Sequence, residues 1–159
     1  MADTRELVLQ SVLGPELSGA EAAKLAALMT LHGLAEGDYL IEEGTADDSL
    51  HVLLEGRLEV IKRTGAGETA SLAVLRAGDL AGELSFIDGE PHTVGLRAMT
   101  ACRILSLERA EFEKLLDSEP RLVYKVMRAV ARSAHAIMRR MNSEFVELSN
   151  YVFKQHGRY

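Results

Sequence analysis

A chain of 159 residues is long enough for one domain with a real core plus an accessory element. Hydrophobic residues make up 47% and charged residues 26%, with no apolar leader and no long apolar run, so we expect neither a signal peptide nor a membrane span. Residues 1–120 carry 10 Lys and Arg against 22 Asp and Glu, whereas residues 121–159 carry 8 against 2; this acidic body argues against broad nucleic-acid binding by the main domain.

The N-terminal segment has helical patterning. Apolar residues recur at helical spacing from Thr4 to Leu13. Ser18 followed by Glu21 fits a capping box, which predicts a second helix from Ala22 to Leu31, ended by the His-Gly pair that follows it.

Short strands are predicted from Gly37 to about Leu107. Short apolar runs alternate there with turn glycines every eight to twelve residues, which indicates a β-sandwich or β-barrel. The run Gly65-Ala66-Gly67 suits the tip of a hairpin between RLEVIKR and TASLAVL.

Helical patterning returns after Glu108. A short helix is predicted from Glu111 to Asp117, and Pro120 suits the start of the next one. No glycine or proline then occurs before Gly157, so we expect one long helix over residues 121–151, about 45 Å in length.

The long helix carries a nearly heptad apolar seam. Its members are Met127, Val130, Ala134, Ile137, Met141, Phe145, Leu148 and Val152. The helix could lie on its own domain, but its length favours packing against a second copy as a homodimer. The flanking basic residues suit a solvated face, which could pair with the acidic body of a partner subunit, better than nucleic-acid binding; they are Arg121, Lys125, Arg128, Arg132, Arg139 and Arg140.

The resulting fold class is α+β, with a β-sandwich or β-barrel between N-terminal helices and a long C-terminal helix. We divide the chain into N-terminal helices (1–33), a core of β-strands (34–118) and the long helix with the residues around it (119–159).

The stretch GELSFIDGEPHTV, residues 82–94, has the layout of an anion site without a basic residue. Gly82 lets the backbone approach a ligand closely. The N–H groups that follow it have no partner in the helix and point out of its N-terminus, where an anion is favoured. Glu83 only accepts hydrogen bonds when ionised and repels phosphate, so it must face a hydroxyl group. Alternatively, Gly82 is a plain turn glycine and Glu83 a charge that stabilises the helix dipole.

A wider pattern surrounds this stretch and resembles the cyclic nucleotide-binding domain of catabolite activator proteins and protein kinase A regulatory subunits. The residues that carry the resemblance are GDYLIEEG (37–44), VLLEGRLEVIK (52–62), LRAGDLAGELSFI (75–87) and RAMTACRILSL (97–107). It implies an eight-stranded jelly roll with a phosphate-binding cassette at 82–94. It also implies that Glu83 binds the ribose 2′-hydroxyl and that helix-start amides, with an arginine, bind the cyclic phosphate.

The cassette departs from the family at one position. The residue nine after Glu83 is arginine in the family and His92 here, between Pro91 and Thr93. Histidine is shorter, offers fewer donors than arginine and is mostly neutral at pH 7 when unperturbed. Losing a charged hydrogen-bonding partner costs roughly 1.5–3 kcal/mol, about ten- to two-hundred-fold in affinity. His92 could also be a loop histidine with no ligand role.

The resemblance also suggests pocket walls. Val60 and Leu72 align with residues along the sugar and purine, although both could be ordinary core residues. The positions over the purine fall on Ile137 and Met138, which makes a base-specific contact from the long helix doubtful. The predicted ligand-binding residues are therefore Gly82, Glu83, Leu84, Ser85, His92, Thr93, Val60 and Leu72.

Other chemistry finds no support in the sequence. The five histidines lack zinc-ligand spacing, and no nucleophile–base pair or phosphate loop can be defended, so we expect no catalytic residue, no metal and no cofactor. The single cysteine, Cys102, rules out an internal disulfide and suits a cytoplasmic protein.

The function predicted is a non-catalytic sensor that binds cyclic AMP, cyclic GMP or a similar small anion, weakly or at low pH, and signals through the long helix. One alternative is a protein-interaction domain that binds no cyclic nucleotide. Another is the sensor part of a transcription regulator, which requires a DNA-binding domain beyond Tyr159.

Overall fold

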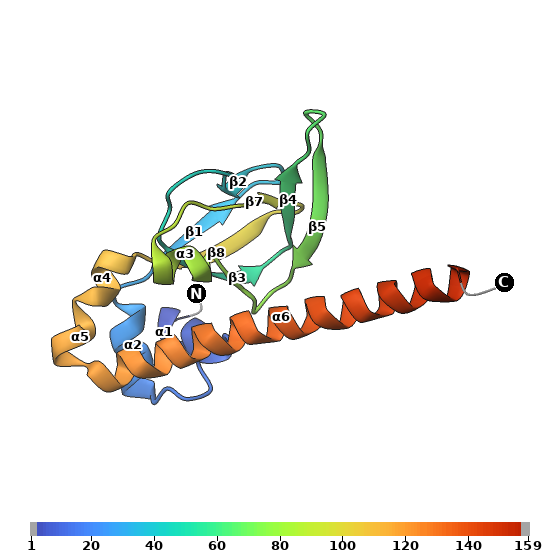
Figure 1. Cartoon of the computed structure of the whole chain (residues 1–159). Coiled ribbons are helices and arrows are strands. Elements are labelled where there is room, and N and C mark those ends of the chain that lie inside the picture. The colour runs from blue at the N-terminus through green and yellow to red at the C-terminus, as the bar shows by residue number, and fades with distance from the viewer. Residues whose placement is uncertain (1–2, 157–159) are drawn as a thin grey trace.

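The computed structural model describes residues 3–156 and contains two antiparallel sheets flanked by helices (Figure 1). The strands are β1 Thr30–Leu34, β2 Tyr39–Ile41, β3 Leu50–Glu55, β4 Leu58–Arg63, β5 Thr69–Leu75, β6 Leu80–Ala81, β7 Gly95–Ala98 and β8 Cys102–Leu107. The helices are α1 Thr4–Gln10, α2 Gly19–Ala26, α3 Glu83–Asp88, α4 Arg109–Glu113, α5 Leu115–Ser118 and α6 Pro120–His156.

The two sheets form the predicted jelly roll. One has the strand order β1-β8-β3-β6 and the other β2-β7-β4-β5. Small and branched residues of both sheets fill the space between them; the fully buried ones include Leu53, Leu58 and Ile104. The hairpin predicted at Gly65-Ala66-Gly67 is present, since Thr64 N–H donates to the Glu68 carbonyl across the tip between β4 and β5. The predicted fold class is therefore confirmed.

The N-terminal helices are shorter than the sequence predicted. The helix expected to reach Leu13 ends at Gln10, because the Ser11 hydroxyl bonds the Val8 carbonyl and competes with the helix backbone. The helix expected over Ala22–Leu31 begins at Gly19, with the predicted Ser18 capping box, and ends at Ala26.

Residues after α2 form a strand instead of a helix end. Thr30–Leu34 is β1, whose backbone pairs in register with β8 from Thr30 opposite Ser106 to Leu34 opposite Cys102. This strand begins before residue 34, where the sequence placed the start of the jelly roll. Helical patterning misled here because the hydrogen-bonding partner lies about seventy residues away in the chain.

The C-terminal helices also differ in their bounds. The single helix predicted over Glu111–Asp117 is two short helices, α4 and α5, and the long helix runs from Pro120 to His156, beyond both ends of the predicted 121–151. At 1.5 Å per residue, the 37 residues of α6 span about 55 Å.

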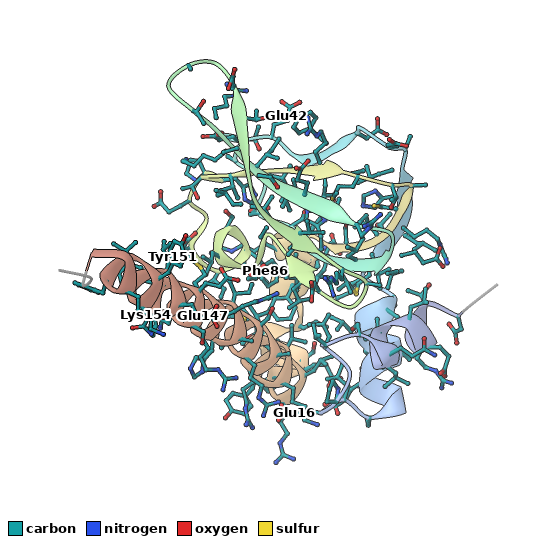
Figure 2. The ribbon with its side chains drawn as sticks, turned by 90° about the vertical axis from the view of Figure 1, so that its right-hand side faces the viewer. Glu16, Glu42, Phe86, Glu147, Tyr151 and Lys154 are labelled. Carbon is teal, nitrogen blue, oxygen red and sulfur yellow. The ribbon has the colours of Figure 1, made fainter. Side chains whose placement is uncertain are left out.

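One apolar cluster joins the helices to the first sheet. Leu122, Val126 and Val130 of α6 are fully buried in it, together with residues of α1, α2, β3, β8 and α4. Phe86 of α3 belongs to the same cluster, 3% exposed, and its ring lies 5.3 Å from that of Phe112. Figure 2 shows Phe86 near the centre of the molecule, between the jelly roll and the helices. The 82–94 stretch is thus packed onto the start of α6.

Candidate ligand-binding site

The predicted cassette occupies the connection between β6 and β7, with α3 at its start. Gly82 precedes α3 in the left-handed conformation, with φ 74°. A Cβ atom at this position would lie 2.9 Å from the Ser49 carbonyl oxygen, so both backbone conformation and space require glycine. The first N–H groups of α3 have no acceptor within the helix, as at any helix start.

Glu83 is the first residue of α3 and is 9% exposed. Burial raises the pKa of its carboxyl group above the ordinary value, and the nearby charge of Asp79 raises it further, while a backbone hydrogen bond opposes both. A buried carboxylate gains from a hydroxyl donor, because the hydroxyl replaces the water lost on burial. This is the chemistry that recognition of a sugar hydroxyl needs.

His92 is 9% exposed, and both of its ring nitrogens contact protein atoms. Nε2 lies 2.6 Å from the Asp47 carbonyl oxygen; since a carbonyl only accepts, Nε2 carries a proton and donates it. In the neutral ring Nδ1 then accepts from the Ser85 hydroxyl at 3.2 Å. The His92 backbone also pairs with the loop after β2, through Gly44 and Thr45. The ring therefore ties the cassette to the 44–49 loop.

A polar network extends from this contact through the first sheet. The Asp47 carboxylate lies 3.1 Å from His51 Nε2, and this hydrogen bond is the main cause that lowers the Asp47 pKa to about 2. His51 Nδ1 lies 2.6 Å from the Ser106 hydroxyl, which lies 2.7 Å from His32 Nε2 on β1. Burial, with the neighbouring His51, lowers the pKa of His32. Neither the chain of contacts from His51 through Ser106 to His32 nor the contact of Asp47 with His92 was predicted from the sequence.

Thr93 is exposed, and its carbonyl oxygen accepts a hydrogen bond from Lys62 Nζ at 2.8 Å. Lys62 lies on β4 and was not among the predicted site residues. The alternation of residues along β4 was the signal that could have found it, because Lys62 is two residues after Val60.

The structure brings some predicted residues together and leaves others apart. Of the predicted residues in the cassette, Glu83, Ser85 and His92 are buried, whereas Thr93 is exposed. Val60 pairs with Leu96 of β7 and packs against the cluster that contains Leu96 and Ala81, the residue before Gly82.

Two predicted residues are open to solvent. Leu84 is 63% exposed on α3, and Leu72 is 57% exposed at an irregularity in the β4–β5 pairing. Neither is an ordinary core residue. Leu72 precedes Ala73, which is also exposed and pairs with Val60 of β4. This part of β5 is therefore open to solvent beside Val60.

A separate hollow of about 270 Å³ lies at one end of the second sheet and coincides with none of the predicted ligand-binding residues. It is lined by Tyr39, Glu42, Glu43, Ile61, Arg63, Thr69 and Gly95. Within residues 3–156, no group of three His, Cys, Asp or Glu side chains is placed to hold a metal ion. Over the same residues, no helix has both the length and the apolarity to cross a bilayer.

The jelly roll, with a glycine-led helix start and a buried carboxylate between β6 and β7, has the layout that the sequence resemblance implies. The profile of the family described as "Cyclic nucleotide-binding domain" matches residues 31–119, more than half of the chain. The chain belongs to this family.

Comparisons with individual proteins agree with the family. Human patatin-like phospholipase domain-containing protein 6 is 29% identical over 133 residues, which cover 80% of this chain. The CRP-like cAMP-activated global transcriptional regulator of Mycobacterium tuberculosis is 26% identical over 82% of the chain. The match spans 10% of the human protein and 58% of the regulator. This chain therefore resembles a part of each relative.

Solved structures share the fold. A cyclic nucleotide-binding domain from Methylobacillus flagellatus superposes with a TM-score of 0.83 and 26% identity, covering 90% of this chain and 83% of that one. The regulatory subunit of a cAMP-independent protein kinase A from Trypanosoma cruzi, bound to guanosine, has a TM-score of 0.63 and 27% identity, covering 72% and 42%.

Proposed function

We propose that the chain is a non-catalytic, cytoplasmic sensor domain that binds cyclic AMP or cyclic GMP at residues 82–94 and signals through α6. The observation that carries the proposal is the start of α3, where Gly82 is left-handed and Glu83 is buried, in a chain of the cyclic nucleotide-binding family. In this proposal Glu83 accepts from the ribose hydroxyl, and the helix-start amides with Ser85 and Thr93 hold the cyclic phosphate.

Contacts between α3 and α6 support a route for the signal. Phe86 is buried in one cluster with Leu122 and Val126 of α6 and with Phe112. Since this cluster is close-packed, a displacement of α3 by a ligand changes the packing of α6. The ligand shifts α6 only if it binds the two arrangements with different affinity.

The far half of α6 supports a homodimer. In Figure 1 this half extends away from the jelly roll. Met127 and Val130 of the predicted seam pack on the chain's own core, whereas Met141, Phe145 and Leu148 are 60–70% exposed. An exposed apolar stripe at nearly heptad spacing suits a second copy of the same helix.

Basic residues at the start of α6 pair within the chain. Lys125 Nζ lies 2.7 Å from Glu21, and Arg128 and Arg132 both reach Glu16, at 3.4 and 2.7 Å. These contacts fix α6 to the N-terminal segment. The sequence suggested that this basic face pairs with the acidic body of a partner subunit, whereas these three residues pair with acidic groups of their own chain. This pairing favours a structural role for the basic face over nucleic-acid binding.

A calorimetric titration tests the proposal. We expect saturable heat with cyclic AMP or cyclic GMP up to millimolar concentration, weaker than an arginine-containing cassette would give, and its loss in Glu83→Ala. Absence of binding by both nucleotides at millimolar concentration would refute nucleotide sensing and would leave an interaction domain of the same fold.

A nucleoside without a phosphate is a second candidate ligand. It is favoured because both ring nitrogens of His92 are engaged by Asp47 and Ser85, and because the related Trypanosoma cruzi subunit is bound to guanosine. Titration with guanosine and adenosine separates the candidates. Tighter binding of the nucleosides than of the cyclic nucleotides would establish the second one.

A further inference from the structure

The charge of the cassette raises the question of what neutralises a bound phosphate. Residues 82–94 contain Glu83, Asp88 and Glu90 and no lysine or arginine. His92, in the arginine position, uses its ring nitrogens on Asp47 and Ser85. A phosphate at this site would add negative charge to an acidic segment, so a cation from another element is needed.

Lys62 of β4 lies on the strand face that turns toward the cassette. The β4–β7 pairing is regular from Leu58 opposite Ala98 to Ile61 opposite Gly95. Side chains alternate along a strand, which places Leu58, Val60 and Lys62 on one face. Leu58 is fully buried between the sheets, and Val60 packs against the cluster that contains Ala81, the residue before Gly82. Lys62 therefore lies on the same face of β4 as Leu58 and Val60, the face that turns toward the other sheet and the cassette.

The ammonium group of Lys62 is already attached to the cassette. Its Nζ donates to the Thr93 carbonyl oxygen at 2.8 Å and to Glu43 Oε1 at 3.3 Å. Among the lysine and arginine side chains of residues 3–156, Lys62 is the one that hydrogen-bonds to the 82–94 stretch. An ammonium group has three donors, so the two contacts leave one N–H for an anion at Thr93.

Glu43 holds the lysine in this position. Its other oxygen accepts from the Arg63 backbone N–H at 2.9 Å, and that bond, followed by the Lys62 contacts, lowers the Glu43 pKa below its ordinary value. The carboxylate consequently stays ionised at neutral pH and fixes Nζ beside Thr93. The side chain of Lys62 remains about half exposed, so its head can reorient toward a ligand.

We propose that Lys62 supplies the positive charge for a phosphate bound at the cassette, in place of the arginine that His92 replaces. This inference rests on the proposed cyclic-nucleotide binding and adds a specificity-determining residue from a different element. It also predicts discrimination: Lys62 contributes to binding of a cyclic nucleotide and contributes nothing to binding of a nucleoside.

The test measures affinities of Lys62→Met for cyclic AMP, cyclic GMP and adenosine by calorimetry. We expect the variant to bind cyclic nucleotide about tenfold more weakly, the loss of one charged hydrogen bond, with unchanged adenosine affinity. The salt dependence of cyclic-nucleotide binding should become shallower, and Lys62→Arg should keep the wild-type affinity within about threefold.

The matched control is Arg63→Met. Arg63 is the next residue on β4, so its side chain belongs to the opposite strand face, and it lines the separate hollow at the end of the sheet. We expect this variant to keep wild-type affinity for every ligand. Thermal unfolding of each variant establishes that Lys62→Met is folded; the side chain is half exposed, so little stability should be lost.

Three results would overturn the inference. Wild-type cyclic-nucleotide affinity in Lys62→Met would show that the phosphate is held without Lys62. An equal loss for cyclic AMP and adenosine would show a structural effect only. If the wild-type protein and His92→Arg both fail to bind cyclic nucleotides at millimolar concentration, the proposed function fails first, and this inference fails with it.

Discussion

Replacing His92 with arginine separates the structural role of this residue from its effect on the ligand. The substitution removes the bond from Nε2 to the Asp47 carbonyl at 2.6 Å and the contact of Nδ1 with Ser85 at 3.2 Å. Each hydrogen bond contributes about 0.5–1.5 kcal/mol, so the free energy of unfolding without ligand should fall by about 1–3 kcal/mol. In a domain of this size each kcal/mol lowers the melting temperature by about 2–4 °C.

Ligand binding should change in the opposite direction. A guanidinium group that reaches the phosphate adds a charged bidentate contact worth about 1.5–3 kcal/mol, which is a ten- to two-hundred-fold gain in cyclic-nucleotide affinity. Calorimetry measures the gain, and thermal unfolding measures the loss of stability. His92→Leu is the control, because leucine lacks both the donor and the acceptor, with similar destabilisation and no gain in affinity. A folded arginine variant with wild-type affinity would refute the assignment of residue 92 to the phosphate site.

Three further predictions concern other parts of the molecule. Glu83→Gln should abolish cyclic-nucleotide binding yet stabilise the ligand-free protein at pH 7, because the raised Glu83 pKa means that native-state ionisation costs stability as pH rises above 4.5; equal melting temperatures would contradict this. Asp47→Asn should destabilise the protein by about 1 kcal/mol at pH 7, a value reduced for the roughly one-third exposure of the carboxylate. The Asp47 pKa of about 2 lies below the ordinary 3.8, so urea unfolding should show this difference shrinking as pH falls from 4 to 2; a constant difference would exclude the hydrogen bond between Asp47 and His51 as its cause. Glutamate at both Met141 and Phe145 should convert a dimer to a monomer in sedimentation, with unchanged jelly-roll stability, and a dimer in the double variant would exclude the α6 seam.

The cassette shows which features of a site can be predicted from the sequence and which cannot. The order of Gly82, Glu83 and His92 is readable from spacing, and the left-handed Gly82 and the start of α3 confirm the local structure expected there. The orientation of the His92 ring could not be predicted from the sequence, because its partner Asp47 lies 45 residues earlier in the chain. The contact from Lys62 to Thr93 was missed for the same reason.

The sequence by itself determined the features that depend on neighbouring residues. These include the Ser18 capping box, the hairpin tip at Gly65-Ala66-Gly67 and the start of α6 at Pro120. Local conformational preferences and short-range hydrogen bonds decide such features, so a short stretch of residues contains the necessary information.

Only the tertiary structure decided the features that depend on distant partners. β1 exists because its backbone pairs with β8, and only the first part of α6 is buried because the jelly roll and the N-terminal helices cover that part alone. In the same way, folding places Asp47 and Lys62 beside the cassette from other segments. Burial and long-range hydrogen bonds supply the free energy for these arrangements, and neither quantity can be read from the composition of the segment that gains it.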